Sequence, residues 1–414
     1  MNKMYLYIGG GVAALAIIFI VMYIFRPTAT VTPVTGTPDF GTSQDRPGSV
    51  PGTSSTDIPV VNNTPASANQ NIFKVLDGPV AGAILLQMGH PTTTVARFVM
   101  ADSGRVFDLP LDVPGAVPRV VSNTTIPGIV TVAWTAGTSA KGTRGDGVVA
   151  QYIDNGAIKT LHLSFPPATT TLTTQGAVTV KFYPDGIKSV AVSPDGKSVA
   201  YLLATASGSD GYRSAPDGAG VKKLFSLPLK QLLLSWPGVT SLLAQSPANA
   251  SVPGVVFSIN AQTGATEPLL YANGISATAN AAFSKVIYQT AETGSRSSYV
   301  RDVKTGSNAA LSFDPMPERC IWSGTSAIGM YCATPLTYVG ANFLDLWHAG
   351  VATAVDSIFA FNTVTGVSTI VAAPGSQDGG EQANIASLAV SPDDHYLLYI
   401  RKGDRSLWAV RLTQ

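Results

Sequence analysis

The sequence predicts an all-β fold in which seven similar four-stranded units close into a ring. The first observation behind this prediction is composition, because only 12% of the 414 residues are charged while Gly and Pro number 40 and 28. Such a composition is typical of many short strands joined by turns. The second observation is a strand–turn–strand element that recurs along the chain, and the third is a Gly-ending turn that alternates with it. A four-stranded unit repeated about every 40–60 residues is typical of a β-propeller blade.

The first element is an apolar segment over residues 5–25, which contains no charged side chain. A helix of this length rises about 30 Å, which is the thickness of a bilayer core. A cleaved signal peptide is the alternative, but its apolar region would be shorter and a small-residue cleavage site would follow it. We therefore expect residues 1–26 to form a single transmembrane anchor that holds the protein in the cell membrane. The α-amine and Lys3 outnumber Arg26, so the short N-terminus is expected in the cytoplasm and the rest outside it.

The next segment, residues 27–71, is rich in Pro, Thr, Ser and Gly and poor in apolar side chains. Such a segment cannot bury enough surface to offset the entropy of ordering the chain. We expect a disordered linker here, followed by the propeller over residues 72–414. An edge strand hidden within the linker is the alternative.

The clearest repeat runs from Val190 to Tyr201, where a strand leads through a Ser-Pro-Asp-Gly turn into a second strand. It recurs between Leu388 and Tyr399, and degenerate copies occupy Val132–Thr135, Leu234–Pro237, Ala281–Ser284 and Cys320–Ser323. In each copy a Val, Phe or Trp ends a strand just before the turn, and an apolar group at a repeated position packs most simply between neighbouring units. We therefore expect Trp134, Trp236 and Trp322 in the core rather than as platforms on which a ligand stacks.

A second turn ends in Gly, which suits the positive φ that tight hairpin turns require. It ends at Gly104, Gly156, Gly218, Gly264, Gly306 and Gly366. Strands flank several of these turns, so the predicted unit is strand, turn, strand, loop, strand, Gly turn, strand.

Seven segments qualify as the innermost strand of a unit, although six or eight blades remain alternatives. They lie near residues 82–87, 129–134, 188–192, 231–236, 277–283, 319–322 and 385–390. The last unit ends with its third strand, Leu407–Leu412, while an additional strand, Ile72–Leu76, precedes the first unit. A ring closes only when no strand edge is left open. We therefore expect Ile72–Leu76 to supply the missing outer strand of the last blade.

The Ser-Pro-Asp-Gly-Lys and Asp-x-x-Thr-Gly elements resemble the WD40-like PD40 repeats of the TolB-type β-propeller family. The resemblance covers residues 72–414 and implies a propeller architecture. The whole layout is also similar to uncharacterised membrane-anchored propeller proteins of bacterial cell envelopes. The propellers of prolyl oligopeptidases look similar too, but no α/β-hydrolase segment accompanies the repeats here, so the resemblance implies no peptidase activity. The small α/β domain that precedes the TolB propeller is likewise not recognisable.

Cys320 and Cys332 are the only cysteines. The segment between them reads as a β-hairpin centred near Ser326, and residues equally distant from the centre of a hairpin face each other. We expect a Cys320–Cys332 disulfide, which agrees with an extracytoplasmic location because disulfides persist there. Two reduced, buried thiols are the alternative. Zinc is not expected, because no second Cys or His pair has ligand spacing.

The candidate binding loop is an insertion in the sixth unit, Ala333–Asp356. It holds Tyr338, Asp345, Trp347, His348 and Asp356. Loops over a propeller face often carry function, and an Asp, a Trp and a His within four residues could form a polar-aromatic binding patch. The alternative is a loop packed by its own Phe343 and Trp347 that bridges two blades. Elsewhere His90 is expected in a loop, and His162 and His395 are expected as solvated strand and turn residues.

The sequence indicates a membrane-tethered, extracytoplasmic binding scaffold at the cell envelope. No nucleophile elbow, phosphate-binding glycine loop, zinc-protease motif or calcium loop is present, so we expect no catalysis and no cofactor. Beside the lipid bilayer around residues 5–25, the expected partner is a protein or glycan of the envelope. With 26 basic and 25 acidic side chains, the chain lacks the basic stripe that nucleic acids require. The alternative is a cell-surface carbohydrate-active or peptide-processing enzyme with a site in the propeller funnel, since a glycosidase needs only two carboxyl groups.

Overall fold

The computed structural model describes residues 71–89, 91–138, 142–165, 178–291, 294–337, 339–376 and 378–412. All of them belong to one compact unit, residues 57–414. The segments predicted as anchor and linker lie outside the described residues, apart from residue 71. Among the described residues, no helix is long and apolar enough to cross a bilayer.

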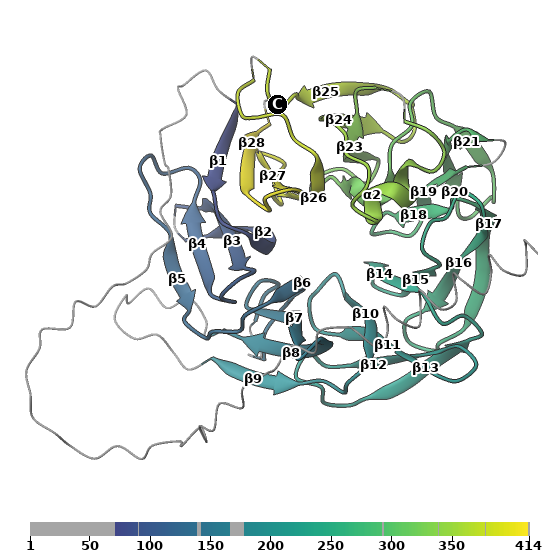
Figure 1. The fold of residues 1–414 in the computed structure, drawn as a ribbon, viewed down its shortest axis with the longest axis horizontal. Coiled ribbons are helices and arrows are strands. Elements are labelled where there is room, and N and C mark those ends of the chain that lie inside the picture. Colours follow the sequence, from purple (N-terminus) through teal and green to yellow (C-terminus); the bar gives the residue numbers. More distant parts are fainter. Residues whose placement is uncertain are drawn as a thin grey trace, which may run out of the picture. The chain divides into compact units, whose positions relative to one another are not determined.

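The described strands form seven four-stranded antiparallel sheets arranged around a centre (Figure 1), as the blades of a propeller are. Within each blade the strands follow one another from the centre of the ring outward. Blade 1 consists of β2 (Val80–Met88), β3 (Thr93–Met100), β4 (Val106–Pro110) and β5 (Arg119–Ser122), and blade 2 consists of β6 (Ile129–Thr135), β7 (Gly147–Asp154), β8 (Ala157–Ser164) and β9 (Thr179–Phe182). Blade 3 consists of β10 (Ile187–Val192), β11 (Val199–Ala204), β12 (Ser209–Ser214) and β13 (Lys222–Leu227). Blade 4 consists of β14 (Leu233–Gly238), β15 (Ser241–Gln245), β16 (Pro253–Asn260) and β17 (Thr266–Asn273). Blade 5 consists of β18 (Ser276–Ala279), β19 (Lys285–Thr290), β20 (Ser297–Asp302) and β21 (Asn308–Ala310). Blade 6 consists of β22 (Cys320–Trp322), β23 (Gly329–Pro335), β24 (Asp356–Asn362) and β25 (Ser368–Ala372). Blade 7 consists of β26 (Ile385–Val390), β27 (Tyr396–Arg401), β28 (Leu407–Arg411) and β1 (Ile72–Leu76).

The ring closes in blade 7, where the first strand of the domain completes the last sheet. β1 pairs with β28 in antiparallel register, with Ile72 opposite Val410 and Leu76 opposite Leu407. Figure 1 shows the purple β1 beside the yellow β28, although the whole domain separates them in sequence. The predicted seven blades, their seven inner strands and the closing strand are therefore confirmed.

The Gly-ending turns are distributed differently from the predicted unit. Gly218, Gly264, Gly306 and Gly366 lie between the third and fourth strands of their blades, as expected. Gly104 and Gly156 lie between the second and third strands instead. All six have positive φ, and both connections are tight antiparallel turns, so the local sequence cannot distinguish the two positions.

The core lies between neighbouring blades. One cluster joins Phe98 and Phe107 of blade 1 to Leu398 of blade 7. Trp134 and Trp236 are only 6% and 7% exposed and belong to the clusters between blades 1 and 2 and between blades 3 and 4. Trp322 is partly buried against the cluster of blades 5 and 6. The prediction that these tryptophans belong to the core is confirmed.

The disulfide prediction is also confirmed. Cys320 of β22 lies directly opposite Cys332 of β23, and their sulfur atoms are bonded. The Cα atoms are 4.1 Å apart, as in a directly facing antiparallel pair. The bridge joins the inner strand of blade 6 to the next strand.

His162 contradicts the prediction of a solvated strand residue. Its side chain lies on β8, is 1% exposed, and shares a 2.9 Å hydrogen bond between Nε2 and Thr135 Oγ1. The third strand of a blade is covered by neighbouring blades on both of its faces, so alternation does not imply exposure here. Burial lowers the pKa of His162 to about 4. His395, in contrast, is an exposed turn residue as expected.

Candidate functional site

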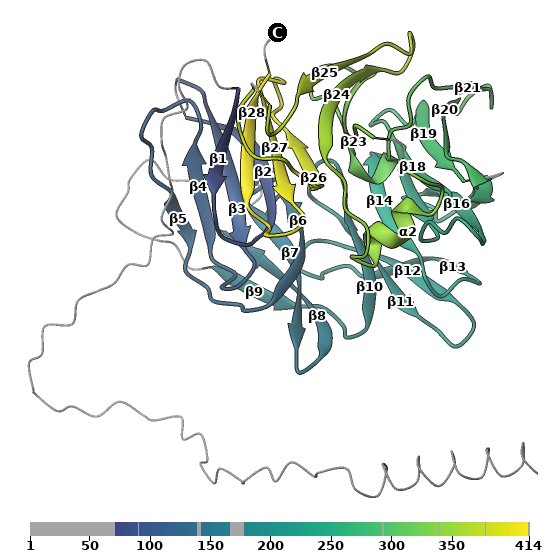
Figure 2. The same ribbon diagram turned by 45° about the horizontal axis from the view of Figure 1, so that its top comes forward.

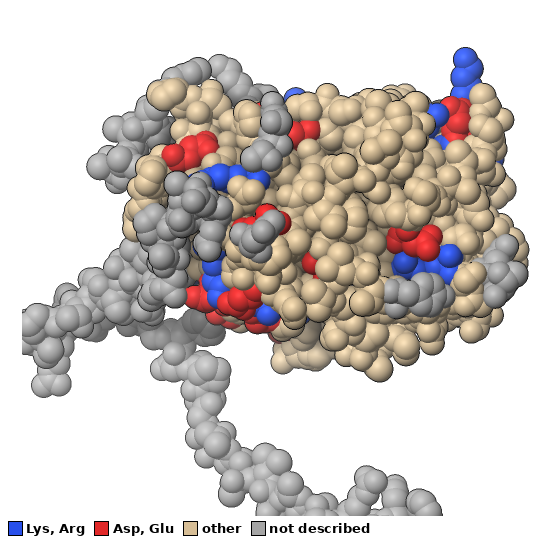
Figure 3. Space-filling view, turned by 90° about the horizontal axis from the view of Figure 1, so that it is seen from above, with Lys and Arg blue, Asp and Glu red and all other residues tan. Residues whose placement is uncertain are grey.

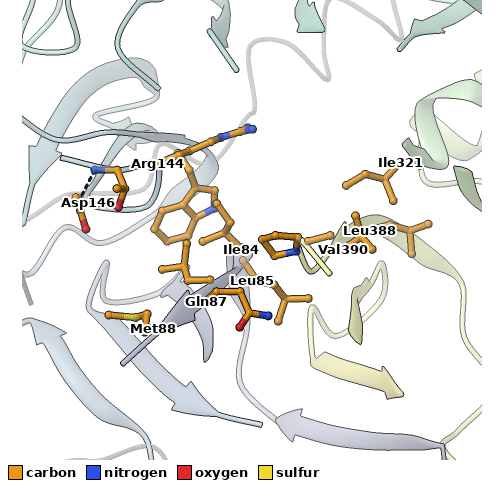
Figure 4. A pocket seen from close by; sticks show the side chains of 15 residues that line it. Ile84, Leu85, Gln87, Met88, Arg144, Asp146, Ile321, Leu388 and Val390 are labelled. Atoms are coloured by element: carbon orange, nitrogen blue, oxygen red, sulfur yellow. Dashed lines mark hydrogen bonds between the residues drawn. The ribbon is translucent and has the colours of Figure 1, made fainter. Parts of the chain in front are cut away.

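A pocket of about 530 Å³ lies at one end of the central opening of the ring. The face of the ring at which the inner strands finish is named the end face. The face at which they begin is named the start face. The pocket lies at the end face, where the later residues of β2 and β26 form two walls. Figure 4 shows these walls with Ile84 and Leu85 on one side and Leu388 and Val390 on the other.

The lining is mostly apolar, with a few polar groups that come from one loop and from β2. The described lining residues are Ala83, Ile84, Leu85, Leu86, Gln87, Met88, Trp134, Thr143, Arg144, Asp146, Ile321, Leu388, Ala389, Val390 and Pro392. An apolar concave surface with few polar groups is typical of binding sites in general.

The loop between β6 and β7 carries the cation of the pocket, Arg144, between two anchored neighbours. Asp146 Oδ2 accepts hydrogen bonds from the Thr143 backbone N–H at 2.7 Å and from its hydroxyl at 3.1 Å. On the other side, the carbonyl of Gly145 accepts a 2.8 Å hydrogen bond from Nη1 of Arg97. These contacts hold the backbone on both sides of Arg144, so the loop presents its side chain in a defined direction.

Arg97 is itself held rigidly beneath the loop. Its guanidinium makes two parallel hydrogen bonds to the carboxylate of Asp108, at 2.7 and 2.8 Å, and both side chains are buried. A two-point pair of this kind fixes the orientation as well as the distance. Arg119 makes a further, longer contact with Asp108 at 3.3 Å. A buried ion pair of blade 1 therefore supports a loop of blade 2.

Arg144 is the distinctive group of the pocket. Its side chain reaches toward the open centre in Figure 4, and it forms no ion pair with any described carboxylate. Solvent reaches the side chain, yet the surrounding walls displace part of its hydration and lower the pKa of Arg144. A partly desolvated guanidinium that pairs with no described carboxylate gains most from an anionic ligand that enters the pocket.

Gln87 is the second polar group and ties blade 1 to blade 7. Its Nε2 donates to Asp393 Oδ2 at 2.7 Å and to Thr94 Oγ1 at 3.2 Å. The same Asp393 oxygen lies 2.8 Å from Nδ1 of His395. The hydrogen bond between Gln87 and Asp393 crosses the junction between the first and last blades, so it fixes the rim of the pocket where the ring closes.

The predicted binding loop lies at the start face, on the side of the ring opposite the pocket. It contains α2 (Phe343–His348), which follows β23 and precedes β24. Phe343 and Trp347 are buried in a cluster with Leu344 and Met316. The arrangement matches the alternative in which the loop packs on its own aromatic side chains.

The predicted site residues of this loop are partly engaged with neighbouring segments. Asp345 accepts a 3.0 Å hydrogen bond from the backbone of Ala250, and Trp347 Nε1 donates to Asn384 at 2.7 Å. His348 is half-exposed, and its Nε2 lies 2.6 Å from Glu318 Oε2. Tyr338 and His90 lie outside the described residues. Ligand binding by this loop therefore remains a prediction.

The described residues contain no group of three or more His, Cys, Asp or Glu side chains placed to hold a metal ion. The end-face pocket combines apolar walls with the guanidinium of Arg144. Sequence reasoning did not find this pocket, because Thr143, Arg144 and Asp146 match no motif. Arg144 meets the residues of β26 only once the ring has closed.

The comparisons with known proteins support the fold. No protein-family model matches the sequence, and no curated protein matches it. Among solved structures, oligogalacturonate lyase in complex with manganese is similar, with 12% identity, a TM-score of 0.51, and coverage of 84% of this chain and 99% of that one. The β-propeller domain of Cps50 (Swd1) from Myceliophteria thermophila has 10% identity and a TM-score of 0.50, over 83% of this chain and 100% of that one.

TolB from Acinetobacter baumannii is also among the similar structures, with 13% identity and a TM-score of 0.42. The match covers 71% of this chain but only 64% of the TolB chain. Together with the seven closed blades, the comparisons with TM-scores of 0.51 and 0.50 confirm the predicted β-propeller fold. Identities this low show the fold alone.

Proposed function

We propose that this protein is a membrane-tethered, extracytoplasmic binding scaffold that captures a protein partner in the end-face pocket. The observation that carries the proposal is the Arg144 guanidinium, which pairs with no described carboxylate and lies beside apolar walls. The ligand that fits these two features is a segment with a carboxylate next to an apolar side chain. The apolar group would bury against Ile84 and Val390, and the carboxylate would pair with Arg144.

Binding fits the pocket better than a hydrolytic function does. Asp146 is the one carboxylate among the described lining residues of this pocket, and it is bonded to Thr143. A glycosidase requires a pair of carboxyl groups across the scissile bond. The similarity to oligogalacturonate lyase lies in the fold and supplies no second acid at this position.

The test is selection of a phage-displayed random peptide library on the purified full-length chain in detergent. We expect enrichment of peptides that combine an acidic group with an apolar residue, and about tenfold weaker binding of those peptides to the Arg144→Ala variant. Lys222→Ala is the matched control, because Lys222 is an exposed cation on the outer strand β13. Failure to enrich such peptides, or equal affinity of Arg144→Ala and the unmodified protein, would reject the proposal.

A further inference from the structure

A second pocket, of about 280 Å³, lies at the start face between blades 7, 1 and 2. It shares the β2 and β26 walls with the end-face pocket but uses the first residues of those strands. The described lining residues are Val80, Ala81, Val130, Ala386, Ser387, Ile400, Arg401, Lys402 and Arg405. The three charged side chains among them are all cations.

Arg405 has an unusual backbone conformation. Its φ is +57°, in the left-handed region that disfavours any residue with a Cβ. Blade 1 has Gly104, with φ +73°, at the corresponding position of its turn between the second and third strands. The correspondence follows from the turn-closing hydrogen bonds, which join Met100 to Arg105 and Arg401 to Ser406. A large cation therefore stands where glycine is the favoured residue, and such strain is typical of functional positions.

The side chain of Arg405 is held at two of its three nitrogens. Nε donates to the carbonyl of Val80 at 3.1 Å, and Nη2 donates to the carbonyl of Val130 at 3.0 Å. Nη1 makes no hydrogen bond to any described residue, and no described carboxylate pairs with the guanidinium. Two neutral carbonyls orient the group but leave its charge uncompensated. Burial lowers the pKa of Arg405, which shows that the positive charge is partly desolvated.

Lys402 brings a second cation without a carboxylate partner among the described residues. Its ammonium lies 3.5 Å from the centroid of the Trp347 ring and donates to the Trp347 carbonyl. Burial, together with the charge of nearby Arg319, lowers the pKa of Lys402. A cation–π contact keeps this ammonium in place without neutralising it.

Arg401 is the one lining cation whose charge is compensated. It pairs with Glu381 at 2.6 Å and with Asp404 at 3.3 Å. Arg319 is likewise compensated by the buried Asp356. The surplus of positive charge therefore rests on Lys402 and Arg405. The exposed hydroxyl of Ser387 adds a neutral hydrogen-bond donor to the same pocket.

We propose that the start-face pocket is an oxyanion-binding site, in which Arg405 and Lys402 receive the carboxylate or phosphate group of a small ligand. Nη1 of Arg405, which bonds to no described residue, and the Ser387 hydroxyl donate hydrogen bonds to the oxygens, and Lys402 supplies charge. The site lies at the opposite end of the ring from Arg144 and is independent of the function proposed for the end-face pocket.

The experiment is calorimetric titration of the purified full-length chain with inorganic phosphate and with acetate, at constant ionic strength against chloride. We expect one of the two anions to bind, and which one binds identifies the ligand chemistry. The Arg405→Gly variant should weaken that binding by about tenfold or more, since a charge-assisted contact is lost. Arg405→Lys keeps the positive charge but lacks the forked set of guanidinium donors. Its affinity for the anion should lie between those of the unmodified protein and the Arg405→Gly variant.

The Arg405→Gly variant suits this test because glycine accepts the positive φ without strain. Ser387→Ala and Lys402→Gln are independent probes of the pocket should the glycine variant fold poorly, and each is expected to weaken binding. Lys222→Ala, which removes an exposed cation of the outer strand β13, is the matched control and should bind the anion normally. No anion binding above the chloride baseline, or unchanged affinity in all folded pocket variants, would overturn the proposal.

Discussion

At the scale of single residues, several residues have an unfavourable backbone conformation or a buried polar atom, and neighbouring residues hold them in place. Arg405 and Asp394 have left-handed backbones without being glycine. Asp394 offsets this cost by accepting hydrogen bonds from Gly324 at 2.8 Å and from the Thr325 hydroxyl at 2.6 Å, which bind blade 7 to blade 6. His162 is a third case, because its Nδ1 is buried and has no hydrogen-bond partner among the residues that the structure describes.

The buried His162 predicts a loss of stability in mild acid. The pKa of His162 is about 4 in the folded state against 6.5 when exposed, so between these values the unfolded chain binds more protons. The stability that the neutral His162 contributes to the folded state is therefore complete above pH 6.5 and is lost as the pH falls toward 4. At pH 5 the loss amounts to about 2 kcal/mol.

The measurement is denaturant unfolding at pH 7 and pH 5 for the unmodified protein and for His162→Gln. Glutamine can keep a hydrogen bond to Thr135 but does not titrate. We expect the variant to lose less stability than the unmodified protein between the two pH values. Equal losses in both proteins would contradict the assignment.

At the scale of elements, blades 3 and 7 share the same hydrogen bond in the turn between their first and second strands. In the Ser-Pro-Asp-Gly turn of blade 3, the Ser193 hydroxyl accepts from the Ser198 backbone at 2.9 Å. In blade 7 the Ser391 hydroxyl accepts from Tyr396, also at 2.9 Å. Such local hydrogen bonds depend on a few adjacent residues, which is why the turns could be recognised in the sequence.

β1 is the element on which closure of the ring depends. We expect Val75→Asp to destabilise the domain by about 3 kcal/mol or more, because an unpaired carboxylate would replace a side chain that is 1% exposed. Thr369→Asp is the matched control, since Thr369 is exposed on β25, the corresponding outer strand of blade 6. Denaturant unfolding measures both variants. Similar stabilities for the two would contradict the role assigned to β1.

Structure that depends on neighbouring residues could be predicted from the sequence, as the blades and the Cys320–Cys332 bridge show, because they follow from alternation, turn residues and hairpin geometry. The closing strand could also be predicted, because the last unit lacks an outer strand. Burial and pockets that depend on how the blades pack could not be predicted. Burial of His162 depends on which blade covers its strand, and no local pattern carries that information. The Arg144 and Arg405 pockets each combine residues of blade 7 with residues of blades 1 and 2, so neither is visible before the chain ends meet.

At the scale of the whole molecule, the surface carries few charges. The view in Figure 3 shows charged residues in small mixed groups between broad uncharged areas. The oblique view in Figure 2 shows β1 and β28 side by side, with α2 in a different part of the ring. With a net charge of +1, the domain has no long-range field of one sign, and recognition must rely on local sites.

The predicted membrane anchor can be tested on the whole protein in cells. Deleting residues 1–26 should move the protein from the membrane fraction to the soluble fraction, because the only long apolar segment of the sequence is removed. Deleting residues 31–50 is the control and should leave the protein in the membrane fraction. External protease applied to intact cells with permeabilised outer layers should cleave the linker. A full-length chain found soluble, or mature protein that begins after residue 26, would contradict the prediction.

The pairing of β1 with β28 has a mechanical consequence. Ile72 lies opposite Val410, near the end of β28, so the chain joins the propeller at the outer edge of its last blade. Any pull on the segment before β1 loads this ladder along the strand axis, and its hydrogen bonds, which are perpendicular to that axis, share the force. The strand that closes the circle is thus also the point at which tension enters the domain, and blade 7 bears a load before any other blade does.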